Sequence, residues 1–247
     1  AVWTAVMDLL YPPCCTFCDD PLPDGSVPHL LCAPCKQLLN QETLRSGKTN
    51  EICERCGWRM GPGECSRAKC PSCGSVPPFL HRVFYVGRYQ GELRQAVIRA
   101  KRPAEHPLAA SLGGLLAEKM IETGRSFRVD IAVPIPKFWT KRIVRGTNTA
   151  EVLVEAIGRR LAVRTAPAAL AARRRTRKQG LLRKSQRDAN VRGSMVVRTG
   201  YDFHATHVLV VDDIMTTGAT AREAARVLRK CGAAAVSLAV IAYAAQE

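Results

Sequence analysis

The sequence contains no long apolar run and no nucleotide-binding glycine motif, and both absences narrow the possible classes of protein. No stretch approaches the roughly 20 apolar residues that a membrane-spanning helix needs, so we expect no membrane span. The first ten residues contain Asp8 and no basic start, so we expect no signal peptide and a cytoplasmic protein. There is also no Walker A motif and no dinucleotide fingerprint. No residue stands out as a general base.

Acidic residues are also scarce, with 21 Asp and Glu against 37 Lys and Arg in 247 residues, a net charge of +16. The excess is concentrated between Lys137 and Arg192, which contains 16 basic and 3 acidic residues. Such a block attracts polyanions, either a pyrophosphate-bearing substrate or a nucleic-acid backbone. Its aromatic residues are Phe138 and Trp139 alone, so base-stacking platforms of the kind found in single-strand binders are sparse.

Ten of the 11 cysteines precede residue 74 and form an internal repeat. Two C-x-x-C pairs, separated by thirteen residues, recur 38 positions later; the two sets are Cys15, Cys18, Cys32 and Cys35, then Cys53, Cys56, Cys70 and Cys73. Each set can place four thiolates around Zn²⁺, so we expect two structural zinc ions. Metal ligation would supply folding energy in a section with few apolar residues.

Other interpretations of the cysteines are weaker but differ in their consequences. Disulfides would need an oxidising compartment, and redox chemistry would need a thioredoxin-like context that is absent here. The pairs could also interleave in a cross-braced pattern. Cys14 and Cys65 are surplus, although either could replace a neighbouring ligand. Cys231 continues an apolar helical stripe and is predicted to lie in the core.

The stretch from Val208 to Thr220 has the pattern of a ligand-binding strand and loop. Four apolar residues, Val208 to Val211, predict a strand buried on both faces of a parallel sheet. Asp212 and Asp213 follow at its C-terminal end, where open α/β sheets bind ligands. The loop after them, rich in Thr and Gly, can direct N–H groups and hydroxyls at a phosphate. The carboxylates would repel that phosphate, so we expect them to bind ribose hydroxyls or a divalent metal.

The remaining pattern predicts strands that alternate with helices, which is typical of a parallel sheet covered on both faces. Strands are expected at 83–89, 131–133, 195–197 and 235–242. Helices are expected around residues 93–100 and 108–116, from Asn148 as an N-terminal cap, and from Thr220 to Gly232. Thr220 and Glu223 have the spacing of a capping box. Pro77-Pro78 predicts a boundary between a cysteine module, 1–80, and an α/β domain, 81–247.

The motif at 208–220 resembles the site for 5-phosphoribosyl-1-pyrophosphate in type I phosphoribosyltransferases. The resemblance implies a fold of that type, with Asp212 and Asp213 on the ribose hydroxyls, partly through Mg²⁺. It implies that the following loop holds the 5′-phosphate through Thr216, Thr217, Gly218, Ala219 and Thr220. A solvated acidic pair beside a capped helix is the alternative.

The order of parts along the whole chain resembles the ComF family, which joins a cysteine zinc module to a phosphoribosyltransferase-type domain. The matching segments are Leu9 to Pro13, Val133 to Pro136, the basic segment with Arg145-Gly146 and Asn148, and 179–193. The sequence departs from the family at Arg102, Thr147 and Thr149, where an aromatic, an aromatic and a Gln are usual. The resemblance places pyrophosphate at Pro136, Lys137, Arg142 and Arg145, with Lys137 and Arg142 neutralising the leaving group.

Two classes of function follow from these resemblances. The first is a Mg²⁺-dependent phosphoribosyltransferase, and the ComF resemblance implies a role in natural transformation, with single-stranded DNA and the DNA-uptake machinery as partners. A nucleobase-salvage or purine-pathway transferase is the conventional competitor. The second class is a non-catalytic regulator that senses the phosphoribosyl compound and binds nucleic acid.

Overall fold

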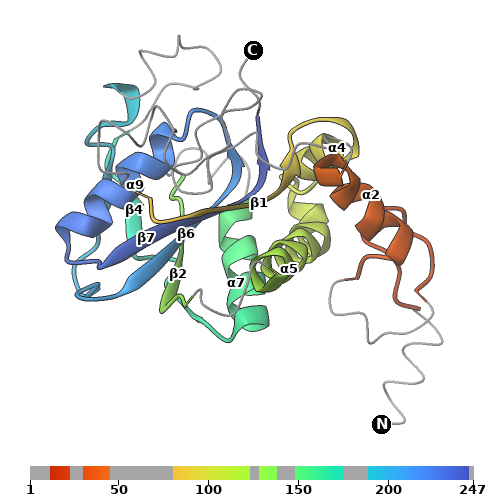
Figure 1. The fold of residues 1–247 in the computed structure, drawn as a ribbon, viewed down its shortest axis with the longest axis horizontal. Coiled ribbons are helices and arrows are strands. Elements are labelled where there is room, and N and C mark those ends of the chain that lie inside the picture. The colour runs from red at the N-terminus through yellow and green to blue at the C-terminus, as the bar shows by residue number, and fades with distance from the viewer. Residues whose placement is uncertain are drawn as a thin grey trace.

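A five-stranded, fully parallel sheet forms the centre of the protein (Figure 1). We describe it from a computed structural model, in which residues 12–22, 30–44, 80–122, 128–137, 148–174 and 189–244 are described. The strand order is β1 (Val83–Arg88), β7 (Ala235–Tyr243), β6 (His207–Met215), β2 (Ile131–Pro134) and β3 (Arg164–Thr165). The parallel sheet and the predicted strands at 83–89, 131–133, 208–211 and 235–242 are therefore confirmed.

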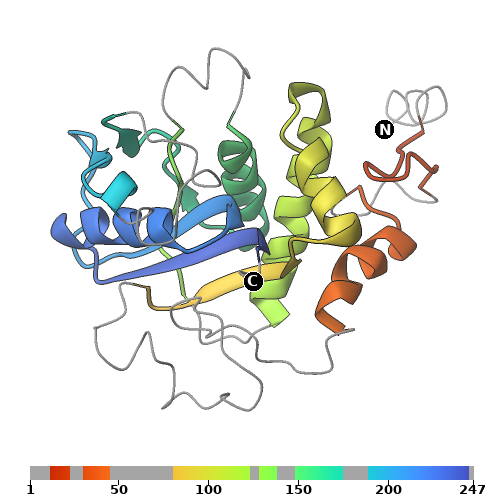
Figure 2. The same ribbon diagram turned by 90° about the horizontal axis from the view of Figure 1, so that it is seen from above.

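Helices cover both faces of the sheet, as predicted (Figures 1 and 2). One face carries α5 (His106–Glu122) and α7 (Thr149–Leu161), with α4 (Gly91–Arg99) and the short helix η1 (Pro103–Glu105) beside them. The other carries α9 (Ala219–Lys230). Helix α2 (Ala33–Leu44) lies at the outer side of α4 and α5. None of the described helices is both long and apolar enough to cross a membrane.

Strand β6 separates two apolar cores because its side chains alternate between the two faces of the sheet. Leu209 and Val211 pack into the core beneath α5 and α7. Val208 and Val210 pack into the core beneath α9. All four side chains are fully buried, as expected for a central parallel strand.

The connections that leave β2 and β6 run in opposite directions across the sheet. From β2 the chain crosses through α7 to β3, at one edge of the sheet, while from β6 it crosses through α9 to β7 on the opposite side. Such a change of direction opens a crevice at the carboxyl ends of the two strands, and open α/β sheets bind ligands there. The residues that follow Pro134 and Val211 are therefore the candidates for a ligand site.

Several predicted details are wrong. Strand β6 continues through both carboxylates to Met215, paired along its length with β7. Helix α9 begins at Ala219 rather than Thr220, and its cap residue is Gly218. The proposed capping box is absent, because the Glu223 carboxylate accepts a hydrogen bond from the Gly193 N–H. Cys231 is exposed, since α9 ends at Lys230 before the stripe can continue.

The predicted strand at Met195–Val197 exists as β5, but it lies outside the main sheet. It pairs in the antiparallel sense with β4 (Leu170–Ala172), which was not predicted. This two-stranded sheet packs against α9, and it shares the core on that side through Leu170 and Met195. Three-residue strands have too few positions for a periodic pattern, so the sequence could not reveal the pairing.

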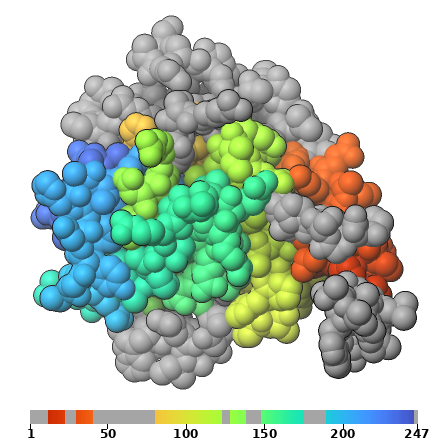
Figure 3. All heavy atoms as spheres, turned by 90° about the horizontal axis from the view of Figure 1, so that it is seen from below, coloured from red at the N-terminus to blue at the C-terminus, as the bar shows by residue number. Residues whose placement is uncertain are grey.

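The first cysteine unit packs directly on the α/β domain. Leu22, Leu31 and Leu39 are buried in the same core as the side chains of α4 and α5. The Thr16 hydroxyl donates a hydrogen bond to the Ser111 hydroxyl of α5 at 3.0 Å. Figure 3 shows α5 and α7 on one face of the molecule, with the cysteine segment at one side and the later part of the chain at the other. The cysteine unit has too few apolar residues to form a core of its own, and its leucines are buried in the core of the α/β domain instead.

Candidate functional site

The two carboxylates at the end of β6 point to opposite faces of the sheet. Their alternation continues that of Val210 and Val211, which face the α9 side and the α5 side respectively. Asp212 therefore belongs to the α9 side and Asp213 to the side of α4 and α5. Each carboxylate has different neighbours, although the two residues are adjacent in the chain.

Asp212 shares a small cavity with the loop that begins α9. The cavity has a volume of about 20 Å³, and residues of the predicted phosphate loop line it together with Asp212, namely Thr216, Gly218 and Thr220. Burial raises the pKa of Asp212 to about 8, and the negative charge of Asp213 adds to this increase. The structure thus brings this carboxylate to the loop, as the sequence predicted.

The loop from Thr216 to Gly218 is fixed at both ends. Gly218 has φ = 72°, a left-handed conformation that favours glycine, and caps α9. The Arg222 guanidinium donates a hydrogen bond to the Thr217 carbonyl at 2.7 Å. Ala219 donates its N–H to the Thr217 hydroxyl at 3.4 Å. The loop and the first turn of the helix therefore form one preorganised unit.

Two lysine side chains lie near the same carboxylate oxygen of Asp213. The Nζ of Lys101 lies 3.3 Å from Oδ2 of Asp213, and the Nζ of Lys137 lies 4.0 Å from the same atom. Lys137 was predicted for this site, whereas Lys101 was not. No pattern in the sequence pairs Lys101 with a carboxylate, because the two residues are more than a hundred positions apart.

Asn148 holds the turn that carries Lys137. Its side-chain oxygen accepts from the Ala150 N–H, which confirms the predicted helix cap, and its amide donates to the Ile135 carbonyl at 3.1 Å. Asn148 is almost fully buried. The N–H of Ile135 in turn donates to the Val211 carbonyl, so the ends of β2 and β6 are tied together. Pro136 lies in this turn. Arg142 and Arg145 lie outside the described residues.

The donor set of the site fits a magnesium ion held together with a substrate. Mg²⁺ is usually bound through one or two carboxylates and substrate phosphates rather than by a complete protein cage. Asp212 and Asp213 supply hard oxygen donors at the crevice, and the lysines beside them favour an anionic ligand. These residues would supply the protein's share of the ligands of the ion.

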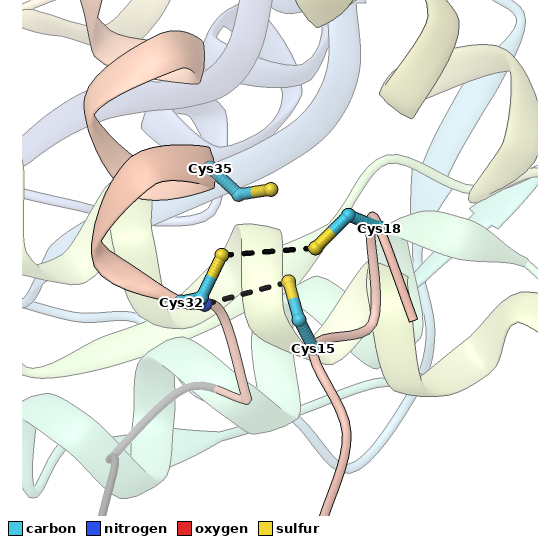
Figure 4. Close-up of side chains that lie close together, drawn as sticks. All are labelled: Cys15, Cys18, Cys32 and Cys35. Carbon is cyan, nitrogen blue, oxygen red and sulfur yellow. Dashed lines mark hydrogen bonds between the residues drawn. The ribbon is translucent and has the colours of Figure 1, made fainter. Parts of the chain in front are cut away.

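The first four cysteines form a cluster suited to a metal ion (Figure 4). Their sulfur atoms all lie within 4.8 Å of one another. Cys15 and Cys18 come from one turn, and Cys32 and Cys35 come from the start of α2. The Cys18 and Cys32 sulfurs are 3.7 Å apart, close to the roughly 3.8 Å edge of a tetrahedron with Zn–S bonds of about 2.3 Å.

The arrangement groups the first C-x-x-C pair with the second. Cys14, next to Cys15 in the chain, is outside the cluster, and its thiol donates instead to the Pro12 carbonyl. Burial opposes ionisation of Cys15, but N–H groups of Cys18, Cys32 and Phe17 outweigh it and lower its pKa to about 7. Cys53, Cys56, Cys65, Cys70 and Cys73 lie outside the described residues.

Residues 147–247 match the phosphoribosyl transferase domain family. Over 234 residues the chain is 28% identical to DNA utilization protein YhgH of Escherichia coli, covering 93% of this chain and 96% of the relative. It is 23% identical to Competence protein F of Haemophilus influenzae over 206 residues, covering 82% and 85%. The chain thus combines a segment that matches the phosphoribosyl transferase domain with an N-terminal cysteine cluster. These similarities support its resemblance to the ComF family.

Solved structures give weaker matches. The glutamine phosphoribosylpyrophosphate amidotransferase from B. subtilis is 17% identical, with a TM-score of 0.38 over 55% of this chain and 26% of its own. A hypoxanthine-guanine phosphoribosyl transferase from L. donovani is 14% identical, with a TM-score of 0.35 over 55% of this chain and 71% of its own. This chain therefore spans about a quarter of the amidotransferase.

Proposed function

We propose that the protein binds 5-phosphoribosyl-1-pyrophosphate with Mg²⁺ at the carboxyl ends of β2 and β6. This proposal rests on one observation: the two adjacent carboxylates have different neighbours. Asp212 shares a cavity with the phosphate loop, while Asp213 faces two lysines across the crevice. A sugar with a phosphate at one end and a pyrophosphate at the other matches that order of loop, acids and cations.

The roles of the residues follow from their chemistry. Asp212 and Asp213 accept hydrogen bonds from the ribose hydroxyls, and the ordered N–H groups and hydroxyls from Thr216 to Thr220 hold the 5′-phosphate. Pro136 and Lys137 face the pyrophosphate, joined by Arg142 and Arg145. Bound Mg²⁺ would add charge neutralisation at the pyrophosphate.

We infer that the reaction class is phosphoribosyl transfer. A nucleophile forms a bond to C1′ of the ribose, and the bond from C1′ to the pyrophosphate oxygen breaks. The pyrophosphate departs with that bonding electron pair, so catalysis consists chiefly of positioning and charge neutralisation. Lys137 and Arg142 stabilise the negative charge that develops on the leaving group.

Titration calorimetry with the sugar pyrophosphate and Mg²⁺ tests the proposal. Wild-type protein should bind, and the Asp212→Asn/Asp213→Asn variant should bind roughly 100-fold more weakly, because an amide cannot lose a proton to bind the metal as an anion, as a carboxyl group can. Asp202→Asn is a matched control, since Asp202 is exposed and its oxygen, which accepts from the His204 N–H, is retained in Asn. Equal affinity of the double variant and the control would refute the site.

The relatives point to a role in DNA utilization and competence for the whole chain. Two of them bear the names DNA utilization protein and Competence protein F, and the alignment with the first covers both the cysteine section and the α/β domain. We therefore propose that the protein acts with single-stranded DNA and the DNA-uptake machinery, in the cytoplasm. Pyrophosphate release with a panel of nucleobases would instead favour salvage or purine-pathway synthesis. Tight binding without turnover would favour a regulator.

The N-terminal module, 1–80, is proposed to hold two zinc ions beside the phosphoribosyltransferase domain, 81–247. The first ion would occupy the cluster of Cys15, Cys18, Cys32 and Cys35. The second would occupy Cys53, Cys56, Cys70 and Cys73, which repeat the same spacing. Metal analysis of the intact chain should find about two zinc ions per molecule.

A further inference from the structure

The proposed function gives a role to Lys137 but none to Lys101, the other lysine that pairs with Asp213. Lys137 follows β2, on the pyrophosphate side, and is the more distant partner at 4.0 Å. Lys101 is the closer partner at 3.3 Å, and it comes from the corner between α4 and η1. That corner lies before the segment 147–247 that matches the phosphoribosyl transferase family. Both lysines therefore lie outside the matched segment, and Lys101 makes the closer ion pair with Asp213.

The corner that carries Lys101 is held in place by several hydrogen bonds. The Lys101 N–H donates to the Ile98 carbonyl, and the Arg102 N–H donates to the Arg99 carbonyl. The Thr149 hydroxyl, at the start of α7, donates to the Ala100 carbonyl at 3.5 Å. Lys101 therefore extends from a fixed backbone, and its contact with Asp213 is built into the fold.

Lys101 lies against a carboxylate that is largely withdrawn from solvent. The Asp213 side chain is only 14% exposed, and Asp212 stands next to it on the same strand. A positive charge at 3.3 Å offsets the negative charge gathered there. Lys101 supplies this charge from a side chain that is 29% exposed and can move away into solvent.

We propose that Lys101 is a built-in counter-ion that occupies Asp213 until a divalent cation displaces it. This makes Lys101 a positioning residue, because the ion pair at 3.3 Å holds the carboxylate in place before ligands arrive. It also sets the cation concentration that the site needs, because the metal must compete with an ammonium group. The proposal rests on the proposed function only for the identity of the sugar ligand, and not for the competition itself.

Mn²⁺ serves as the probe, with the free ion measured by its paramagnetic resonance signal in the absence of sugar. Removing a competing charge from a partly exposed pair should tighten binding, so Lys101→Gln should bind Mn²⁺ about fivefold more tightly than wild type. Lys101→Arg keeps the charge and should stay near wild type. Lys119→Gln is the matched control, since Lys119 is 27% exposed and pairs with Glu122 on α5. It should leave Mn²⁺ affinity unchanged.

A measurement on the unaltered protein avoids any effect of substitution on folding. Acylation of lysine amines, read by mass spectrometry, should label Lys101 several times faster when Mn²⁺ is saturating, while labelling of Lys119 stays constant. The proposal is overturned if Lys101→Gln binds Mn²⁺ with wild-type affinity. It is also overturned if the labelling rate of Lys101 is the same with and without Mn²⁺. If these tests succeed but the sugar pyrophosphate does not bind, the proposed function fails and the counter-ion role stands. If the sugar binds and these tests fail, the reverse holds.

Discussion

The Arg99 guanidinium donates a hydrogen bond to the carbonyl of Phe17 at 2.7 Å. Phe17 lies between Cys15 and Cys18, so this bond joins the first cysteine turn to helix α4. The same guanidinium stands over the Phe17 ring and pairs with Glu105 at 3.2 Å. Lys101 follows Arg99 by two residues. The metal cluster and the counter-ion of Asp213 are thus supported by one short segment of chain.

Replacing Arg99 with Ala should loosen the cysteine unit from the α/β domain. The planar guanidinium makes several bonds at once, so we expect a loss of about 2 kcal/mol in the free energy of unfolding and faster transfer of zinc to a chelator. Thermal unfolding and a colorimetric zinc assay measure the two effects. Arg94→Ala provides the control on the same helix, because Arg94 is exposed. If both variants lose zinc at the wild-type rate, Arg99 does not anchor the unit.

Two adjacent cysteines offer a sharp test of the metal cluster. Cys15→Ser removes a cluster ligand, whereas Cys14→Ser removes a thiol outside the cluster. The Cys15 variant should contain about one zinc ion fewer per chain and unfold at lower temperature, because metal binding contributes folding energy. The Cys14 variant should match wild type. Elemental analysis checks both, and an equal zinc content in the two variants would contradict the assignment.

The sheet and most of its helices could be predicted because their signals are local. Buried parallel strands appear as apolar runs, as at Val208 to Val211, and the cap at Asn148 needs only its own neighbours. The apolar run Val208 to Val211 also indicated that the acidic pair lies toward the carboxyl end of a central strand. The cysteine cluster followed from spacing alone. Each of these features is encoded within about 20 residues of chain.

The errors share a different cause, which is contact between distant segments. Glu223 has the spacing of a capping box, but its carboxylate accepts hydrogen bonds from the Gly193 N–H and the Arg226 guanidinium instead. The pair of Lys101 and Asp213 joins residues more than a hundred positions apart. Cys231 fits the stripe of α9 but falls after the last helical turn. Tertiary contacts of this kind leave no periodic trace in the sequence.

The proposed role with DNA predicts a measurable salt dependence. Arg173 and Arg174 are exposed where the basic block leaves β4, and each phosphate contact contributes about 0.7 to the slope of log affinity against log salt for single strands. The Arg173→Gln/Arg174→Gln variant should therefore lower that slope by about 1.4. Arg229→Gln/Lys230→Gln at the end of α9 is the control, because both side chains are exposed and lie outside the basic block. Fluorescence anisotropy with labelled single strands measures the slopes. Identical slopes in wild type and in the Arg173/Arg174 variant would remove these two residues from any DNA surface.

Glu223 predicts how stability changes with pH. The side chain is nearly buried, and burial alone would raise its pKa, but the Arg226 guanidinium and the Gly193 N–H outweigh burial and lower it below the ordinary value of 4.5. A lowered carboxyl pKa stabilises the folded protein above the unfolded value, and this contribution is lost as pH falls through the folded pKa. At pH 7, Glu223→Gln should lose about 1–2 kcal/mol of unfolding free energy, because the Arg226 charge then lacks its partner.

The difference between wild type and this variant should stay constant from pH 7 to about pH 5 and shrink below about pH 4.5, where the unfolded carboxyl begins to bind protons. Urea unfolding at several pH values measures it. Glu122→Gln is the control, since Glu122 is 60% exposed and pairs with Lys119 of the preceding turn. A difference that remained constant down to pH 3 would show that the Glu223 charge does not stabilise the join between α9 and the chain at Gly193.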